Sequence, residues 1–322
     1  MSNSLLGMVQ GAIYNRRITK TSIVDPVFVL GHWRSGTTHL HELLALDERY
    51  AFPTTFECSA PHHCLLTGGV YPKLFSWLLP GKRVMDDMKQ GFNRPQEDEL
   101  ALVALGAASP MWSLAYSTEN KGQAYLTLRD ISATERKEWE QLLLKFLRLV
   151  TYRRRGKRLI LKSPAHTGRL AVLAKLFPTA RFLHIVRDPY EVFASTVHLW
   201  RRTQAVSALT QGSEQELEDY VLRSLRQMYD GFDAVRASLS PGRFHQVRYE
   251  QLIAEPTKVL EESYRALGLG DFAPVRSRVE THIESIGDYR TNQYEISSAA
   301  RDAVSGAWGT IFRGWGYDIC RT

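Results

Sequence analysis

The chain has 322 residues, of which 44% are hydrophobic, so it can bury a large core; an α/β domain with insertions reaches this length. Its formal net charge is +7, which favours an anionic partner. The basic residues are dispersed, and this argues for a small polyanion rather than a nucleic acid. The densest basic cluster, residues 153–158, lies at the end of a predicted helix, where we expect it to complete the helix dipole and stay solvated.

The cysteines and the apolar runs exclude further classes of protein. Cys58, Cys64 and Cys320 have no metal-ligand spacing and leave one odd thiol, so neither a metal site nor a disulfide framework is predicted. The longest near-apolar stretch at the N-terminus, residues 5–13, is interrupted by Gln10 and is too short to cross a bilayer. We therefore expect no transmembrane segment and a reducing compartment, most simply the cytoplasm.

The first half of the chain opens with a strand and a helix and then loses that alternation. We predict a short helix within residues 1–24, a buried strand over 27–30, a helix from residue 37 and an extended segment over 50–57. Residues 58–130 lack regular alternation of strand and helix, and we interpret them as a helical insertion that shapes an acceptor pocket. Ser132 and Glu135 then form a capping box for a long helix that runs to about residue 154.

The second half alternates regularly between strands and helices. Strands are predicted over residues 158–161, 181–186 and 244–248, and helices over 167–177, from 189, over roughly 213–239 and from 256. Because no repeat, low-complexity tract or linker interrupts the chain, we predict one domain over residues 1–322. The alternation predicts an α/β fold with a P-loop-like parallel sheet between helices, a three-layer sandwich that binds ligands at the strand C-termini.

The segment VFVLGHWRSGTTHLHELL, residues 27–44, reads as strand, tight loop and helix. The loop places Arg34, Ser35, Gly36, Thr37 and Thr38 where the helix would begin. The unpaired N–H groups and positive dipole of a helix N-terminus favour a phosphate, and hydroxyl and guanidinium donors suit oxyanions. An ordinary glycine-containing turn is the alternative, but such a run of polar donors is not typical of packing residues. We therefore predict an anion site.

The loop differs from a nucleotide-binding P-loop at one important position. Gly31 and Gly36 have the G-x-x-x-x-G spacing and Thr38 lies where a magnesium-ligating hydroxyl would be, but Thr37 occupies the position of the expected lysine. This mismatch argues against a kinase that moves a γ-phosphoryl group. A P-loop phosphotransferase, with Asp188 as a Walker B-like carboxylate, stays an alternative, as does a non-catalytic nucleotide or polyanion binder.

Arg34 to Thr38 resemble the 5′-phosphosulfate loop, P-[KR]-S-G-T-[TS], of sulfotransferases that use 3′-phosphoadenosine-5′-phosphosulfate (PAPS), although Trp33 replaces the usual proline. Arg187 and Ser195, in IVRDPYEVFAST, resemble the 3′-phosphate motif of that family, an arginine at a strand end with a serine eight residues later. The segment 247–269, which includes Tyr249, is similar to the family pattern V-x-Y-E-D-L…P…L-G-L. The resemblance covers residues 27 to about 270.

This resemblance implies the chemistry and the ligands. PAPS would be the co-substrate and 3′-phosphoadenosine-5′-phosphate (PAP) the product, without a metal; the acceptor would be a hydroxyl or amine of a small molecule, lipid or carbohydrate. Arg34 fills the slot of the loop cation, and Lys162 is similar to a family lysine near the transferred sulfuryl group. Positioning and cationic stabilisation would then carry most of the catalysis. A homodimer is a possible assembly.

The resemblance leaves the general base and the C-terminal contacts open. Glu57 is placed like the base of carbohydrate and tyrosine sulfotransferases, and His166 is its rival, although it falls four residues after Lys162 where small-molecule members have two. His62 and His63 are weaker candidates. The usual R-K-G loop is absent, so Arg290, with Asn292, is expected to close over the 3′-phosphate; Tyr249 completes the predicted cofactor-binding set.

Overall fold

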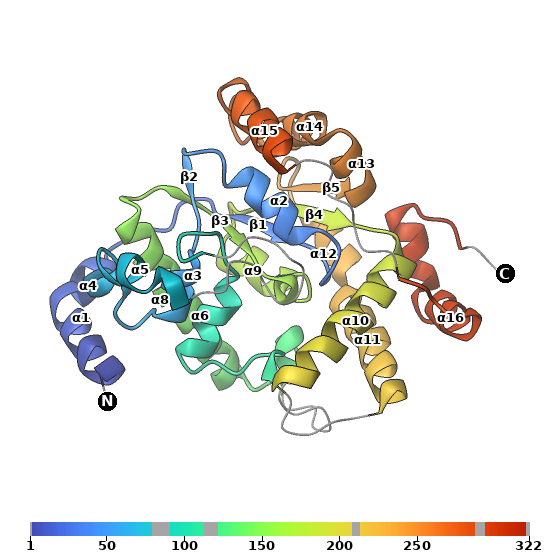
Figure 1. Cartoon of the computed structure of the whole chain (residues 1–322), viewed down its shortest axis with the longest axis horizontal. Coiled ribbons are helices and arrows are strands. Elements are labelled where there is room, and N and C mark those ends of the chain that lie inside the picture. Colours follow the sequence, from blue (N-terminus) through green and yellow to red (C-terminus); the bar gives the residue numbers. More distant parts are fainter. Residues whose placement is uncertain (1, 79–90, 113–121, 208–212, 287–293, 320–322) are drawn as a thin grey trace.

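The computed structural model describes residues 2–78, 91–112, 122–207, 213–286 and 294–319 (Figure 1). Five parallel strands form a sheet in the order β2-β3-β1-β4-β5. The strands are β1 (Val27–Leu30), β2 (Tyr50–Ala51), β3 (Arg158–Lys162), β4 (Arg181–Val186) and β5 (Phe244–Arg248). β1 lies in the middle, between β3 and β4, and the strand order reverses around it. The loop after β1 therefore leaves the sheet at the point where α/β sheets bind ligands.

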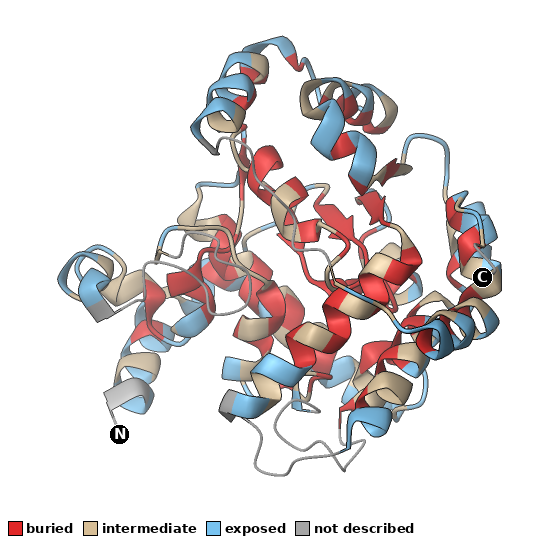
Figure 2. Cartoon of the chain, turned by 45° about the vertical axis from the view of Figure 1, so that its right-hand side comes forward, coloured by how far each residue is buried: buried red, intermediate tan, exposed pale blue. Residues whose placement is uncertain are grey.

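Alternating side chains of β1 supply both faces of the sheet. Phe28 and Leu30 join one buried cluster, whereas Val27 and Val29 join another on the opposite face. All four are completely buried, as expected of a central parallel strand with helices on both sides. Figure 2 shows the strands as a buried band at the centre of the molecule. The predicted α/β fold, a parallel sheet between helical layers, is confirmed.

Helices cover each face and form a third group beside the sheet. The Phe28 face is covered by α1 (Ser2–Thr19), α3 (Thr55–Ser59), α6 (Asp98–Ala104), α8 (Ala133–Arg153), α9 (Leu170–Leu176) and α12 (Phe232–Ser238). The Val27 face is covered by α2 (Thr37–Leu44), α13 (Tyr249–Ala254), α14 (Pro256–Leu267) and α15 (Ala273–Ile286). The third group, with its own apolar cluster, consists of α10 (Pro189–Ser207), α11 (Glu214–Tyr229) and α16 (Ser298–Trp315).

The described part of residues 58–130 is helical and irregular. It contains α4 (Cys64–Thr67), α5 (Tyr71–Leu74), α6 and two 3₁₀ turns, Ser76–Leu78 and Gln123–Leu126. A third 3₁₀ turn, Pro164–His166, follows β3. Among the residues that the structure describes, no helix is long and apolar enough to cross a membrane.

Two predicted elements differ from the structure for local reasons. The helix predicted over 213–239 is two helices, because Gly231 adopts a left-handed φ of 70° between α11 and α12. The extended segment over 50–57 is wrong at its end, where Thr54 caps α3: its side chain accepts from the Glu57 amide, and the Glu57 carboxylate accepts from the Thr54 amide. The Ser132–Glu135 capping box is confirmed at the start of α8.

Candidate functional site

The loop between β1 and α2 has a backbone suited to an anion. Gly36 has φ +97°, and a Cβ there would lie 2.3 Å from Cδ2 of Tyr249, so the Tyr249 ring packs directly against a glycine. Gly36 is also the N-cap of α2, and a glycine has no side chain with which to cap the helix start. The first amides of α2 therefore keep their capacity to bind an oxyanion.

The predicted loop side chains divide into two groups. Ser35 is completely buried and its hydroxyl donates to the His32 carbonyl at 2.7 Å, so it holds the turn together. Thr37 is also buried. By contrast, the Arg34 Nε donates to Ser195 Oγ at 2.8 Å, and Thr38 Oγ1 accepts from Lys162 Nζ at 3.3 Å. Arg34 thus connects the loop to the helix that contains Ser195, Pro189–Ser207, and Thr38 connects it to the end of β3.

The second predicted motif lies against the first. Arg187, just after β4, donates from Nη1 to the Arg34 carbonyl at 3.1 Å, and its guanidinium stacks over the Tyr249 ring at 4.7 Å. Its other nitrogen approaches Glu191 at 3.3 Å. Arg34, Arg187, Ser195 and Tyr249 therefore form one cluster around the loop, which we call the phosphate cluster.

An acidic run lies on the other side of β1. Glu97 Oε1 accepts from Lys162 Nζ at 2.7 Å, and Asp98 Oδ2 lies 2.7 Å from His166 Nε2. We call the run Glu97-Asp98-Glu99 with its three basic partners Lys162, His166 and Arg169 the paired cluster. The third pair joins Arg169 and Glu99 at 3.0 Å. Acidic residues at the start of α6 also complement its dipole.

Burial controls the ionisation of this region. Burial opposes ionisation of Glu99, but the charge and hydrogen bonds of Arg169 and the Ser109 hydroxyl outweigh it and hold the pKa of Glu99 below its usual value. Burial, reinforced by the Lys162 charge, lowers the pKa of His41 to about 3. Burial also lowers the pKa of His32, within the loop, to about 4, against a hydrogen bond to the Trp33 carbonyl. These two histidines are neutral at pH 7, so they add no positive charge to the site.

Glu57 lies in a buried environment in which its carboxylate is paired with arginines. It is completely buried, its Oε2 accepts from Thr54 N at 2.8 Å, and it pairs with Arg153 at 3.3 Å and Arg154 at 3.1 Å. The expectation that the basic cluster at 153–158 stays solvated is wrong for these two arginines. Their charges neutralise a buried carboxylate instead.

The other candidates for the base, all histidines, also have polar partners within the protein. His166 is completely buried, pairs with Asp98 and meets the Phe28 ring edge-on at 5.4 Å. The exposed His62 bonds the Ala104 carbonyl at 3.0 Å, and His63 lies 2.8 Å from the Thr67 hydroxyl. Arg290 and Asn292 lie outside the described residues, so their predicted role in closing over a 3′-phosphate stays a prediction.

Asp188, suggested above as a Walker B-like carboxylate, caps a helix. Its Oδ1 accepts from the Tyr190 amide at 2.8 Å and from the Glu191 amide at 3.4 Å, at the start of α10. Among the residues that the structure describes, no group of three or more His, Cys, Asp and Glu side chains is arranged to hold a metal ion.

Sequence reasoning missed Glu97. It noted the acidic run only as part of the insertion, although the run EDE at 97–99 and the basic residues at 162, 166 and 169 could have suggested a paired set. The pairing joins segments that are 65 residues apart in the case of Glu97 and Lys162, so spacing alone does not reveal it.

Comparison with known proteins agrees with this geometry. A sequence model of the sulfotransferase family matches residues 26–274. Omega-hydroxy-beta-dihydromenaquinone-9 sulfotransferase Stf3 of Mycobacterium tuberculosis is 40% identical over 320 residues, 99% of this chain and 82% of that protein, and the Mycobacterium bovis protein matches equally.

Two solved sulfotransferases have the same fold. STF9 from Mycobacterium avium has a TM-score of 0.73 at 17% identity, over 98% of this chain and 82% of its own. STF1 from Mycobacterium tuberculosis has a TM-score of 0.70 at 21% identity, over 94% and 82%. The chain belongs to the sulfotransferase family, and it is a sulfotransferase rather than the P-loop phosphotransferase that the sequence alone left open.

Proposed function

We propose that the protein transfers the sulfuryl group of PAPS to a hydroxyl or amine and releases PAP. The 5′-phosphosulfate is assigned to the loop 34–38 and the start of α2, and the 3′-phosphate to Arg187 and Ser195. The observation that carries the proposal is the hydrogen bond of Arg34 to Ser195, which joins two phosphate-type motifs 161 residues apart in the chain. Arg187 on the Arg34 carbonyl and Tyr249 against Gly36 support the same assignment.

The reaction needs stabilisation of charge more than covalent help from the protein. A bond forms between the acceptor oxygen or nitrogen and sulfur, while the bond between sulfur and the bridging oxygen of the 5′-phosphate breaks. Negative charge therefore develops on that oxygen as PAP leaves. Arg34 and Lys162 are the cations proposed to stabilise it, because Arg34 is part of the loop and Lys162 reaches Thr38 at 3.3 Å.

The acceptor must lose one proton, and we propose Glu97 as the group that receives it. Its carboxylate lies 2.7 Å from Lys162 Nζ and is 17% exposed, whereas Glu57 and His166 are completely buried in other pairs. Glu97 can therefore reach both the sulfuryl-stabilising lysine and an incoming acceptor. Glu57 and His166 stay as alternative bases, and variants of all three separate them.

We propose a lipid hydroxyl as the acceptor. The support is the 40% identity, over 99% of this chain, to a protein named as a sulfotransferase of omega-hydroxy-beta-dihydromenaquinone-9, a lipid-like quinone. A metal is not part of the proposed reaction, since guanidinium, ammonium and amide groups supply the positive charge. Whether the protein acts as a monomer or as the predicted homodimer stays a prediction.

Thermal unfolding with nucleotides tests the donor. PAP at about 100 times its dissociation constant should stabilise the fold by roughly 2.7 kcal/mol, and 5′-AMP at the same concentration by much less, because it lacks the 3′-phosphate. Both effects should persist in EDTA. Equal shifts from PAP and AMP would contradict the role of Arg187 and Ser195, and stabilisation by ATP that requires magnesium would contradict the proposed donor.

Mass spectrometry then tests the acceptor. PAPS and a menaquinone analogue with a terminal hydroxyl should give PAP and the sulfated analogue in equal amounts. The matched analogue without the hydroxyl should give neither. Product from both analogues would place the accepting atom elsewhere.

A further inference from the structure

Helix α1 is anchored to the domain along one side. Gln10 is buried, donates to the Pro61 carbonyl at 3.2 Å and accepts from the Leu65 amide at 2.8 Å. Tyr14 and the buried Ile18 follow at helical spacing on the same side and pack on the main core. Packing against the domain therefore explains the residues on this side of α1.

The other side of α1 is apolar and exposed. Leu5, Met8, Val9 and Ile13 follow the i, i+3, i+4, i+8 spacing of one helix face, and each keeps between 41 and 66% of its surface exposed. A surface helix normally presents polar side chains here, so a helix with apolar residues on both sides is unusual for a chain surrounded by water alone. Four neighbouring exposed side chains differ from apolar residues scattered singly.

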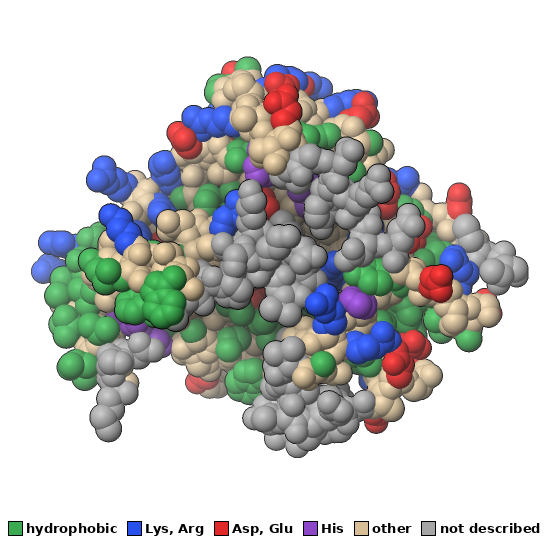
Figure 3. Space-filling model, in the orientation of Figure 1, with side chains coloured by type: hydrophobic (Ala, Val, Ile, Leu, Met, Phe, Trp, Pro, Cys, Tyr) green, Lys and Arg blue, Asp and Glu red, His purple; other side chains and the backbone are tan. Residues whose placement is uncertain are grey.

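A second exposed apolar segment lies beside α1. Val70 precedes α5, Leu74 is its last residue, and Trp77 follows it. All three are exposed, Trp77 to 76%. Helix α1 contacts α4, which immediately precedes this segment. Figure 3 shows hydrophobic side chains gathered on the left of the molecule, over α1, α4 and α5, with Lys and Arg side chains beside them. We call the seven residues Leu5, Met8, Val9, Ile13, Val70, Leu74 and Trp77 the α1 face.

The charged residues of α1 and α5 have one sign. Residues 1–24 contain no Asp or Glu, whereas Arg16, Arg17 and Lys20 are exposed at the end of α1 and after it. Lys73 is exposed within α5. Apolar side chains flanked by basic ones, with a tryptophan at the margin, match a surface that is apolar inside and anionic outside.

We propose that the α1 face docks on the surface of a bilayer that contains anionic lipids, with α1 lying in the interface rather than crossing it. A second copy of the chain is a poorer occupant, because a two-fold contact would bring the same basic residues together with no acidic residue in this helix to pair with them. This proposal does not rest on the donor, acceptor or base proposed above.

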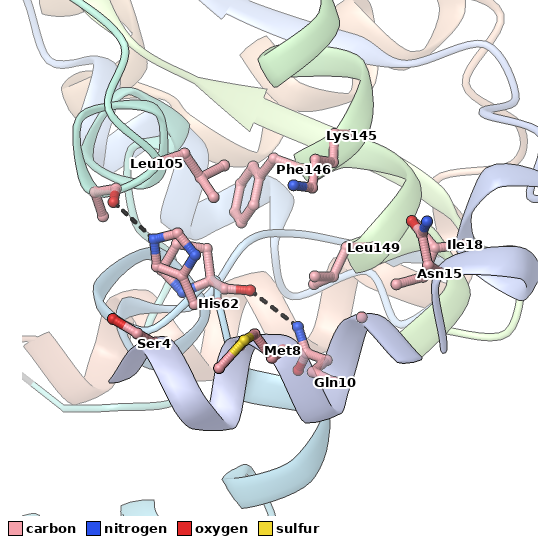
Figure 4. A pocket seen from close by; sticks show the side chains of 14 residues that line it. Ser4, Met8, Gln10, Asn15, Ile18, His62, Leu105, Lys145, Phe146 and Leu149 are labelled. Carbon is pink, nitrogen blue, oxygen red and sulfur yellow. Dashed lines mark hydrogen bonds between the residues drawn. The ribbon is translucent and has the colours of Figure 1, made fainter. Parts of the chain in front are cut away.

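A cavity of about 550 Å³ lies beneath α1, between this helix, α8 and the end of α6 (Figure 4). Met8 lines it and also belongs to the α1 face, so the cavity adjoins that face. Ala104 and Leu105, at the end of α6, also line it, and α6 begins next to Glu97. Docking of the α1 face would bring this cavity close to the bilayer.

Flotation of the full chain with lipid vesicles tests the proposal. We expect the parent to bind phosphatidylcholine vesicles that contain about one third phosphatidylglycerol. Each of the charge reversals Arg16→Glu and Arg17→Glu should weaken this binding roughly fivefold or more. The double variant Val9→Asp/Ile13→Asp should bind at least about tenfold more weakly. Ile253→Asp is the matched control: Ile253 on α13 is 40% exposed, like Val9 at 41%, and this variant should bind as the parent does.

Melting temperature and PAP binding of each variant show whether it is folded. The proposal is overturned if the parent does not float with anionic vesicles, or if the Val9→Asp/Ile13→Asp variant floats as well as the parent. It is also overturned if light scattering shows a dimer of the parent that this variant dissociates, because the α1 face would then be a contact between copies. A protein that floats but binds no PAP would contradict the proposed donor and leave the membrane contact standing.

Discussion

The charged residues on the two sides of β1 differ in ion pairing and in burial. On the β4 side, the phosphate cluster holds two arginines together with a serine and a tyrosine, and Arg187 has only the partly exposed Glu191 as an ion-pair partner among the described residues. On the β3 side, each acidic member of the paired cluster lies beside a basic side chain, and most members are nearly or completely buried.

This difference indicates a division of labour. Arg187 is paired in the described structure with one partly exposed carboxylate, so it keeps positive charge that an anionic ligand can use. Buried pairs, by contrast, fix geometry, because loss of one partner leaves an uncompensated charge. Within the paired cluster the pair of Glu97 and Lys162 is the exception, since Glu97 is partly exposed and Lys162 also donates to Thr38 in the loop. The predictions below test these assignments, from the largest expected effect to the smallest.

Glu97→Gln should lower turnover by on the order of 10²–10⁴ and leave PAP affinity unchanged, because it removes a proton acceptor and keeps the side-chain shape. Turnover and PAP binding are measured side by side, with an acceptor of weakly acidic hydroxyl, since an acidic phenol ionises unaided. Glu57→Gln and His166→Ala are the companion variants. A collapse of turnover in either folded companion, with Glu97→Gln near the parent, would transfer the role of base to that residue.

Glu57→Gln should lower the free energy of unfolding by about 2–4 kcal/mol, because Arg153 and Arg154 then face a neutral side chain across a buried contact. Denaturant titration measures the change. Glu255→Gln is the control, since its ion pair with Lys258 lies on the surface and should contribute less than about 1 kcal/mol. Equal, small losses in both variants would show that Glu57 is not a structural anchor.

Arg187→Ala should weaken PAP binding by about 1.5–3 kcal/mol, the usual range for a hydrogen bond to a charged group. Arg187→Lys should recover part of this, because an ammonium carries the charge but lacks the planar fork that also stacks on Tyr249. Titration calorimetry measures both, with Arg201→Ala on α10 as an arginine control. Parental affinity in Arg187→Ala would mean that the 3′-phosphate is held elsewhere.

Acid should destabilise the protein through the buried histidines. His41 has a pKa of about 3 in the fold against about 6.5 in the unfolded chain, so below pH 6.5 the unfolded state binds a proton that the folded state excludes. Its stabilising contribution is complete above pH 6.5 and falls with pH, by about 1.4 kcal/mol at pH 5.5.

His41→Gln should therefore have a flatter melting-temperature profile between pH 7 and 5.5 than the parent. The exposed His62, replaced by Gln, is the control and should leave the profile unchanged. A profile for His41→Gln as steep as that of the parent would show that His41 takes up a proton in the fold.

The phosphate cluster could be predicted from the sequence because its residues lie in short, ordered motifs. A strand, a glycine loop and a helix place Arg34 to Thr38, and a strand end followed by a helix places Arg187 and Ser195. The strands could be predicted for the same reason: a run such as residues 182–186 is buried on both faces and so is apolar at every position except His184.

The paired cluster could not be predicted in the same way. Glu97 meets Lys162 only because residues 92–96 bond back to the segment before α3, through Thr55 N to the Arg94 carbonyl and Gln96 N to the Pro53 carbonyl. Such long-range contacts leave no periodic signal. The role of Glu57 as base stays a prediction for a related reason, since a glutamate three residues after a threonine has both a capping and a catalytic interpretation.

The backbone conformation of Arg34 affects how the protein can adapt to higher temperature. Arg34 adopts a left-handed φ of 66°, which costs a residue with a side chain about 1–2 kcal/mol and a glycine almost nothing. Glycine at this position would relieve the strain and remove the guanidinium together. Selection for thermal resistance alone would thus favour the loss of the proposed leaving-group cation, and only selection for turnover would keep an arginine there.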